Sequence, residues 1–74
     1  MDGVAIGRIT IVQEDRFRLI DAAGRGYLFI TGKRVASAEQ LDRWRQNGVS
    51  VQVRFTGHPD RGAVARRITP AGND

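Results

Sequence analysis

The chain lacks cysteine and has no long apolar run, and these two absences exclude several classes of protein. Without cysteine there is no disulfide framework and no thiolate metal site. No apolar run approaches the roughly 20 residues of a membrane helix, and the N-terminus lacks a basic segment followed by a long apolar stretch. The 74 residues have room for one small core. We expect one cytoplasmic domain over residues 1–69, no membrane partner, and a disordered tail over 70–74, which is polar and rich in helix and strand breakers.

Lysine is almost absent as well. Lys33 is the only lysine among 12 Lys and Arg residues, which face 8 Asp and Glu residues and give a formal net charge of +4. A surplus of positive charge favours a polyanionic partner. Arginine binds phosphate with two donors and stacks on bases, but a GC-rich genome would also encode arginine in place of lysine. Codon usage does not explain the net charge.

The sequence also lacks the residue sets that catalysis and cofactors need. His58 is the only histidine and lies in a turn near Asp60, without a nucleophile or a second metal ligand. No phosphate-binding loop, metal-ligand spacing or pair of carboxylates occurs elsewhere. We therefore expect a non-enzyme without a cofactor, in which His58 is a turn residue that contacts a phosphate or a base.

Alternation of apolar and polar residues predicts five strands, over 7–12, 16–21, 26–31, 49–56 and 63–68. In the first, Ile9 and Ile11 share the inner face. Val4 and Ile6 have the opposite phase, so we expect a bulge or sharp bend at Gly7. In the second predicted strand, over 16–21, Phe17 points inward.

A helix is predicted over 37–47, between the third and fourth strands. Ser37 and Gln40 form a capping box at its start, and Asn47-Gly48 supplies a stop. Ala38, Leu41 and Trp44 fall on one face at helical spacing. We expect Trp44 to plug the open end of the strands rather than to stack on a base.

Three strands, one helix and two strands is the order of a small all-β protein, the five-stranded oligonucleotide/oligosaccharide-binding (OB) barrel. Within that order, the sequence resembles bacterial translation initiation factor one, a single OB domain. The matching elements are Gly7, Phe17-Arg18, Gly24, Ile30-Thr31-Gly32-Lys33, Gly48 and Arg61-Gly62. The resemblance implies binding to RNA of the small ribosomal subunit.

The chain is also similar to the cold-shock domain, another OB barrel. Asp15 to Ile20 and Tyr27 to Ile30 stand where that family carries its two binding motifs, and Gly62 followed by Ala65 and Ile68 has the spacing of its last strand. This resemblance implies binding of single strands by stacking of bases on aromatic side chains.

The third strand is apolar on both faces, so either Tyr27 and Phe29 or Leu28 and Ile30 point outward. We favour Tyr27 and Phe29, because the phenol needs water or a hydrogen-bond partner. The two rings would form a platform about 7 Å long, from a rise of ~3.3 Å per residue, on which bases stack.

The sequence thus predicts a protein that binds RNA or single-stranded DNA, and the resemblance to initiation factor one alone implies association with the small ribosomal subunit. Its predicted binding residues are Arg8, Arg16, Arg18, Tyr27, Phe29, Lys33, Arg34, Arg54, His58, Arg61, Arg66 and Arg67. A protein-interaction module, or small subunit of a larger assembly, with an exposed Tyr27/Phe29 patch is the alternative. A regulator that binds duplex DNA stays open, although no helix is free for the major groove.

Overall fold

The computed structural model describes residues 2–32, 34–58 and 60–71. The strands and the helix predicted from the sequence are all present in the predicted order. Their bounds are β1 (Asp2–Gln13), β2 (Arg16–Ile20), β3 (Gly26–Ile30), α1 (Ala38–Gln46), β4 (Ser50–Thr56) and β5 (Ala63–Pro70).

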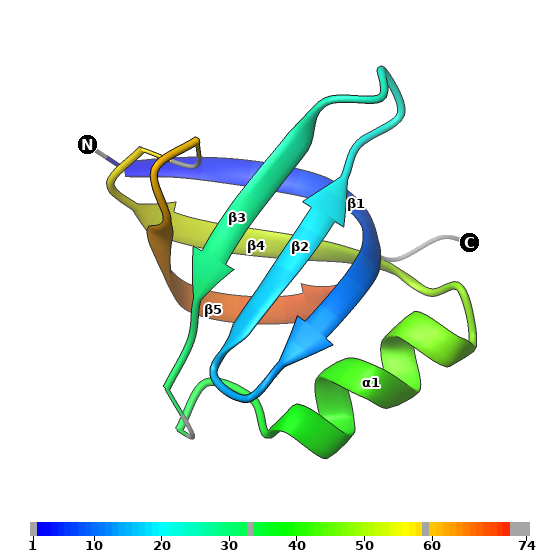
Figure 1. Ribbon diagram of the computed structural model, residues 1–74. Helices are drawn as coiled ribbons and strands as arrows, with labels where there is room; N and C mark the ends of the chain where they lie inside the picture. The colour runs from blue at the N-terminus through cyan, green and yellow to red at the C-terminus, as the bar shows by residue number, and fades with distance from the viewer. Residues whose placement is uncertain (1, 33, 59, 72–74) are drawn as a thin grey trace.

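The strands pair in one closed sheet in the order β1-β2-β3-β5-β4, and β4 pairs with β1 to close the ring (Figure 1). The long first strand makes this closure possible, because Asp2 to Arg8 pair with β4 whereas Arg8 to Gln13 pair with β2. The pairing of β3 with β5 is parallel and short, and the other pairings are antiparallel. The ring encloses one interior.

The change of phase in β1 does not fall at Gly7 as predicted. Ala5, Gly7 and Ile9 all point inward, and the pairing with β2 slips between Ile9 and Ile11. This bulge turns Ile11 outward, where 49% of its surface is exposed, so the prediction that Ile9 and Ile11 share the inner face is wrong. An extra residue in one strand inverts the inward and outward positions beyond it.

Gly7 instead fits the other predicted alternative, a bend, because it lies where β1 leaves β4 and joins β2. A β-carbon at Gly7 would lie 2.2 Å from the carbonyl oxygen of Ile20, a backbone atom whose displacement costs stability. Only glycine allows this close approach of two strands.

The interior is filled by side chains from all five strands and the helix. Phe17, Leu19, Phe29, Leu41, Val51 and Val53 are the largest fully buried ones. The ring of Phe29 lies 5.2 Å from the ring of Phe17 and 5.2 Å from that of Phe55, between centroids. Burial of each large side chain contributes about 1.5–3 kcal/mol to folding, so this cluster is the main source of stability.

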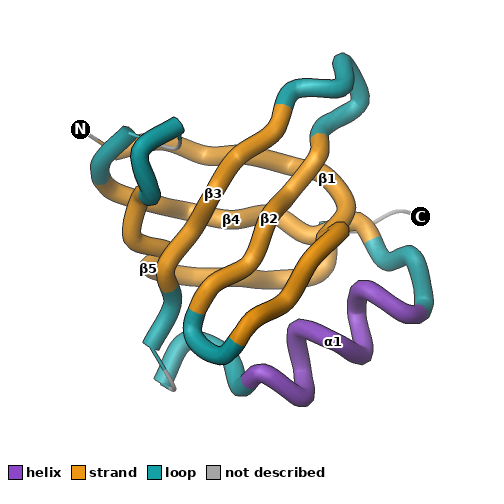
Figure 2. Tube along the Cα trace, viewed as in Figure 1, coloured by secondary structure: helices purple, strands orange, loops and turns teal. Residues whose placement is uncertain are grey.

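The helix lies across one end of the ring and packs against β1 (Figure 2). The Ser37 half of the predicted capping box is confirmed, since the backbone N–H of Gln40 donates to Oγ of Ser37 at 3.1 Å. Leu41 is fully buried and Trp44 is half-buried against the core. Ala38, predicted to share their face, is exposed. No helix in the described part of the chain has the length and apolarity of a membrane-spanning segment.

The last strand is longer than predicted. Pro70, expected in a disordered tail, pairs with Val51 as the last residue of β5, and the N–H of Ala71 donates to the carbonyl of Ser50 at 2.8 Å. Proline is tolerated here because it stands at the strand's end and its missing N–H is not needed. The rest of the predicted tail, 72–74, lies outside the described residues.

Candidate nucleic-acid interface

The predicted platform of Tyr27 and Phe29 on the outer surface is wrong. Phe29 is 0% exposed, and Tyr27 is half-buried with its ring parallel to that of Phe29, 6.1 Å away between centroids. The register decides this, since Phe29 is paired with Phe17 and Tyr27 with Leu19, and cross-strand partners share a face. Inward burial of Phe17 therefore carries both rings of β3 inward.

The phenol of Tyr27 has a hydrogen-bond partner within the protein. Its hydroxyl donates to Oδ2 of Asp21 at 3.0 Å, while Oδ1 of Asp21 accepts from the backbone N–H groups of Ala23 and Arg25 at 3.0 and 2.9 Å. The Arg25 guanidinium lies 5.3 Å from the centre of the Tyr27 ring. This set of contacts closes the turn between β2 and β3.

These contacts shift the acidity of both groups. The hydrogen bond from the Arg25 backbone, with smaller ones from Tyr27 and Ala23, holds the pKa of Asp21 below its ordinary value. Burial raises the pKa of Tyr27, and the hydrogen bond to Asp21 raises it further. The pair stabilises a turn and supplies no acid or base near neutral pH.

With Phe29 inside, Leu28 is the side chain that β3 presents outward. The register places Arg18 between Ile11 of β1 and Leu28 of β3, and Arg16 lies two residues from Arg18 on the same outer face. Both arginines are exposed, as are 49% of Ile11 and 41% of Leu28. These four side chains, which line one shallow hollow with Gln13, are called the arginine face below.

Arg18 lies along the sheet rather than projecting from it. A β-carbon at Gly26 would be 2.8 Å from Nη2 and 3.1 Å from Nε of Arg18, so the guanidinium covers the first residue of β3. The missing side chain at Gly26 thus gives Arg18 its position. Sequence reasoning missed Ile11, Leu28 and Gly26, although pairing of Phe17 with Phe29 would have identified Leu28.

Arg8, a predicted binding residue, is exposed but does not line the hollow of the arginine face. It stands at the bend of β1, paired with Ile20 of β2 and Ser50 of β4. There it lines a separate hollow with Ile6 and Asp21. Its partner Ile20 lies two residues along β2 from Arg18, so Arg8 stands one outward position away from the arginine face.

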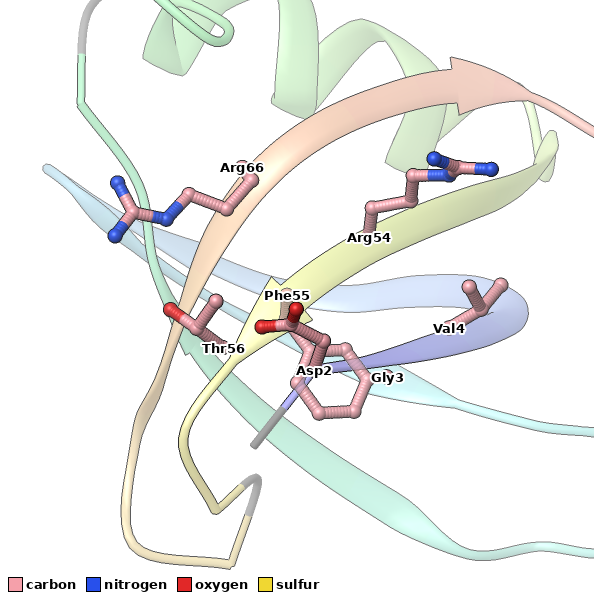
Figure 3. A pocket seen from close by; sticks show the side chains of 7 residues that line it. All are labelled: Asp2, Gly3, Val4, Arg54, Phe55, Thr56 and Arg66. Atoms are coloured by element: carbon pink, nitrogen blue, oxygen red, sulfur yellow. The ribbon is translucent and has the colours of Figure 1, made fainter.

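A second group of arginines lies on the outer side of β4 and β5. Arg54 and Arg67 are paired across the two strands, and Arg66 precedes Arg67 at a shift of register between β4 and β5. All three are exposed. Figure 3 shows Arg54 and Arg66 at opposite ends of a hollow, with Val4 near Arg54 and Thr56 near Arg66.

The remaining predicted binding residues lie in loops. Arg34 is exposed in the connection from β3 to α1, and Lys33 lies outside the described residues. His58 and Arg61 are exposed in the turn from β4 to β5, where the N–H of Arg61 donates to the carbonyl of His58 at 2.9 Å. The two loops leave the ring at different ends of the β3–β5 pair (Figure 1).

Among the described residues, no acidic side chain forms an ion pair with an arginine of the sheet. In the part of the chain that the structure describes, the ion pair is that of Arg45 with Asp42, 2.7 Å apart on the helix. Over the same residues, no three His, Asp or Glu side chains gather as a metal site. The outer surfaces of β2, β4 and β5 therefore offer guanidinium groups to an external anion.

Comparison of the chain with protein-family models, with curated proteins and with solved structures finds no match.

Proposed function

We propose that this protein is a non-catalytic OB-fold domain that binds RNA or single-stranded DNA on its arginine face. Support for the fold comes from the closed strand order β1-β2-β3-β5-β4, the parallel pairing of β3 with β5, and the helix between β3 and β4. In OB folds the outer surface of the second and third strands binds oligonucleotides. The arginine face occupies this surface.

One observation carries the proposal: Arg16 and Arg18 are exposed between Ile11 and Leu28, with no carboxylate of the described residues in ion-pair contact. A guanidinium binds phosphate oxygens with two donors at once and stacks on bases. The aliphatic side chains cover the sugars and base faces beside these contacts. The same surface suits a flexible single strand better than a rigid duplex, because the helix of the described residues packs against β1 and is not free for the major groove.

Without exposed aromatic rings, most of the affinity comes from phosphate contacts. Two or three such contacts to a single strand give a slope of about −1.4 to −2 in log K against log salt concentration, about −0.7 for each contact. The binding is therefore weakly selective for sequence. Base stacking, which contributes roughly 1–3 kcal/mol per base on aromatic platforms, is limited here to the guanidinium planes.

The test is fluorescence anisotropy with labelled single-stranded RNA, single-stranded DNA and duplex DNA at low and moderate salt. We expect tighter binding to the single strands, weakening as salt rises. Equal or tighter binding to the duplex, or no binding at low salt, would contradict the proposal.

The resemblance to initiation factor one extends this proposal to the small ribosomal subunit as the partner. Cosedimentation of the protein with purified subunits tests this step, with an excess of unrelated single-stranded RNA as competitor. We expect a fraction of the protein to stay with the small subunit under competition. Complete displacement of the protein from the subunit would show that it binds single strands in general, and would contradict the small subunit as its partner.

A second candidate function rests on a different surface. Val4 and Ile6 of β1 are 55% and 51% exposed, and their partners on β4 are Arg54 and Gln52. Exposed aliphatic side chains of this kind are typical of protein contacts. In a protein-interaction module, these two side chains would form the contact surface in place of an aromatic patch. Self-association that persists at high salt, measured by light scattering after gel filtration, and that is lost in Val4→Thr/Ile6→Thr would favour this candidate.

A further inference from the structure

The bulge in β5 changes which side chains of this strand point to solvent. The pairing with β4 moves from Phe55 opposite Ala65 to Arg54 opposite Arg67, so Arg66 is the extra residue of β5. Ala65 and Ile68 are buried on either side of the two arginines. The bulge therefore turns two successive arginines outward, which regular alternation does not allow.

The register sets a third arginine directly opposite. Arg54 is the cross-strand partner of Arg67, and like charges in that relation destabilise a sheet. Gln52 and Thr69 line the adjoining hollow with Arg54 and Arg67, and Asp2 is the carboxylate that lines the hollow of Figure 3. No ion pair forms there among the described residues. The cluster has the charge and the polar neighbours that suit an external anion.

This surface is separate from the arginine face. Figure 1 shows β2 and β3 crossing in front of β4 and β5, so the outer sides of the two strand pairs face opposite directions. Arg16 and Arg18 belong to the front pair, whereas Arg54, Arg66 and Arg67 belong to the back pair. A short oligonucleotide bound on one side leaves the other side free.

We infer that the outer side of β4 and β5, carrying Arg54, Arg66 and Arg67, is a second phosphate-binding surface that lets one protein hold two single-stranded nucleic-acid segments. The inference rests on the proposed function and adds to it an ability to bridge strands. The occupant is a nucleic-acid backbone rather than a lone anion, because three guanidinium groups spread over two strands match several phosphates in a row.

A two-strand capture experiment tests the inference. An oligoribonucleotide of about eight nucleotides, within the ~4–16 that one OB domain covers, is fixed to a surface and loaded with protein. A fluorescent oligonucleotide that cannot pair with the first is then added. The variant is Arg66→Gln/Arg67→Gln, and its control is Arg43→Gln/Arg45→Gln, which removes the same charge from the helix.

We expect the wild type and the control to capture the second strand, and the β5 variant to load on the first strand but lose second-strand capture by at least about tenfold. Capture by the β5 variant at the wild-type level overturns the inference. The second strand is then held elsewhere, for example by the arginine face of a second copy in a dimer. Loading of the wild type without second-strand capture overturns the inference and leaves the proposed function intact. Failure of the wild type to load on the first strand overturns both.

Discussion

The guanidinium of Arg18 lies over Gly26, in the space that a side chain on β3 would fill; a β-carbon there would be 2.8 Å from Nη2. The neighbouring atom belongs to the end of a flexible side chain, so Arg18 can swing away at little cost to folding. We predict that Gly26→Ala weakens binding of single-stranded RNA by about two- to fivefold, because the cation is displaced but not removed. Anisotropy titration measures the change.

Gly32→Ala is the matched control for this prediction, since a β-carbon at Gly32 would meet no atom within 4 Å. It is expected to leave binding unchanged. Equal binding by Gly26→Ala and wild type would show that the position of Arg18 does not matter to the interface.

Gly7→Ala is predicted to destabilise the fold by about 1–3 kcal/mol. The added β-carbon would lie 2.2 Å from the carbonyl oxygen of Ile20, so the backbone of β1 or β2 must shift where the ring bends. Urea denaturation monitored by the fluorescence of Trp44 measures the free energy of unfolding. Gly32→Ala again serves as control, and a loss at Gly7 no larger than at Gly32 would contradict the assigned bend.

Much of the fold could be predicted from alternation, because inward Phe17, Leu19, Val51 and Val53 mark their strands without tertiary information. The positions of the two bulges could not be predicted in this way. Each adds one residue and inverts the faces beyond it, and local sequence at Ile11 or Arg66 carries no separate signal for the shift. For a strand that is apolar on both faces, such as β3, alternation does not show which face points inward.

The candidate site shows this difficulty most clearly at β3. The prediction that Tyr27 faces outward rested on its need for a polar partner, but Asp21 supplies that partner from the preceding turn. An aspartate at a strand end, six residues before a tyrosine and across a glycine-containing turn, was the available signal. The exposure of the cationic side chains could be predicted more readily than that of the aromatic ones. The arginines exposed as predicted are Arg16, Arg18, Arg54, Arg66 and Arg67.

The contacts of Asp21 predict a loss of stability in acid. Its pKa is lowered in the folded state from an ordinary value of 3.8, mainly by the backbone hydrogen bond from Arg25. The stabilisation from this carboxylate is thus fully present above about pH 4 and is lost as pH falls through the lower folded-state pKa. Asp21→Asn is expected to make the melting temperature less dependent on pH between pH 5 and pH 2, relative to wild type.

Asp60→Asn, at an exposed carboxylate of the β4–β5 turn, controls for the general effect of removing one negative charge. It should retain the wild-type acid dependence. If Asp21→Asn and Asp60→Asn have the same profile, the turn contacts of Asp21 are not the source of the acid sensitivity.

The pairing of Arg54 with Arg67 predicts that binding and stability are opposed on the β4–β5 side. Arg67→Thr removes a like-charge contact and is expected to raise the free energy of unfolding by about 0.2–1 kcal/mol at low salt. The gain should shrink as salt screens the charges. Arg16→Thr, whose cross-strand partners are Gln13 and Ile30, should show no such salt-dependent gain. A destabilised Arg67→Thr would mean that the arginine is held by contacts within the protein.

The most direct measurement is the affinity of the double variant Arg16→Gln/Arg18→Gln for single-stranded RNA as a function of salt, compared with Arg43→Gln/Arg45→Gln. Both variants lower the formal net charge by two, but only the first alters the arginine face. We predict that the first variant binds at least about tenfold more weakly at low salt and has a shallower salt dependence, while the second stays close to wild type. Equal losses in both would show that net charge alone attracts the nucleic acid, and would contradict the arginine face as its binding site.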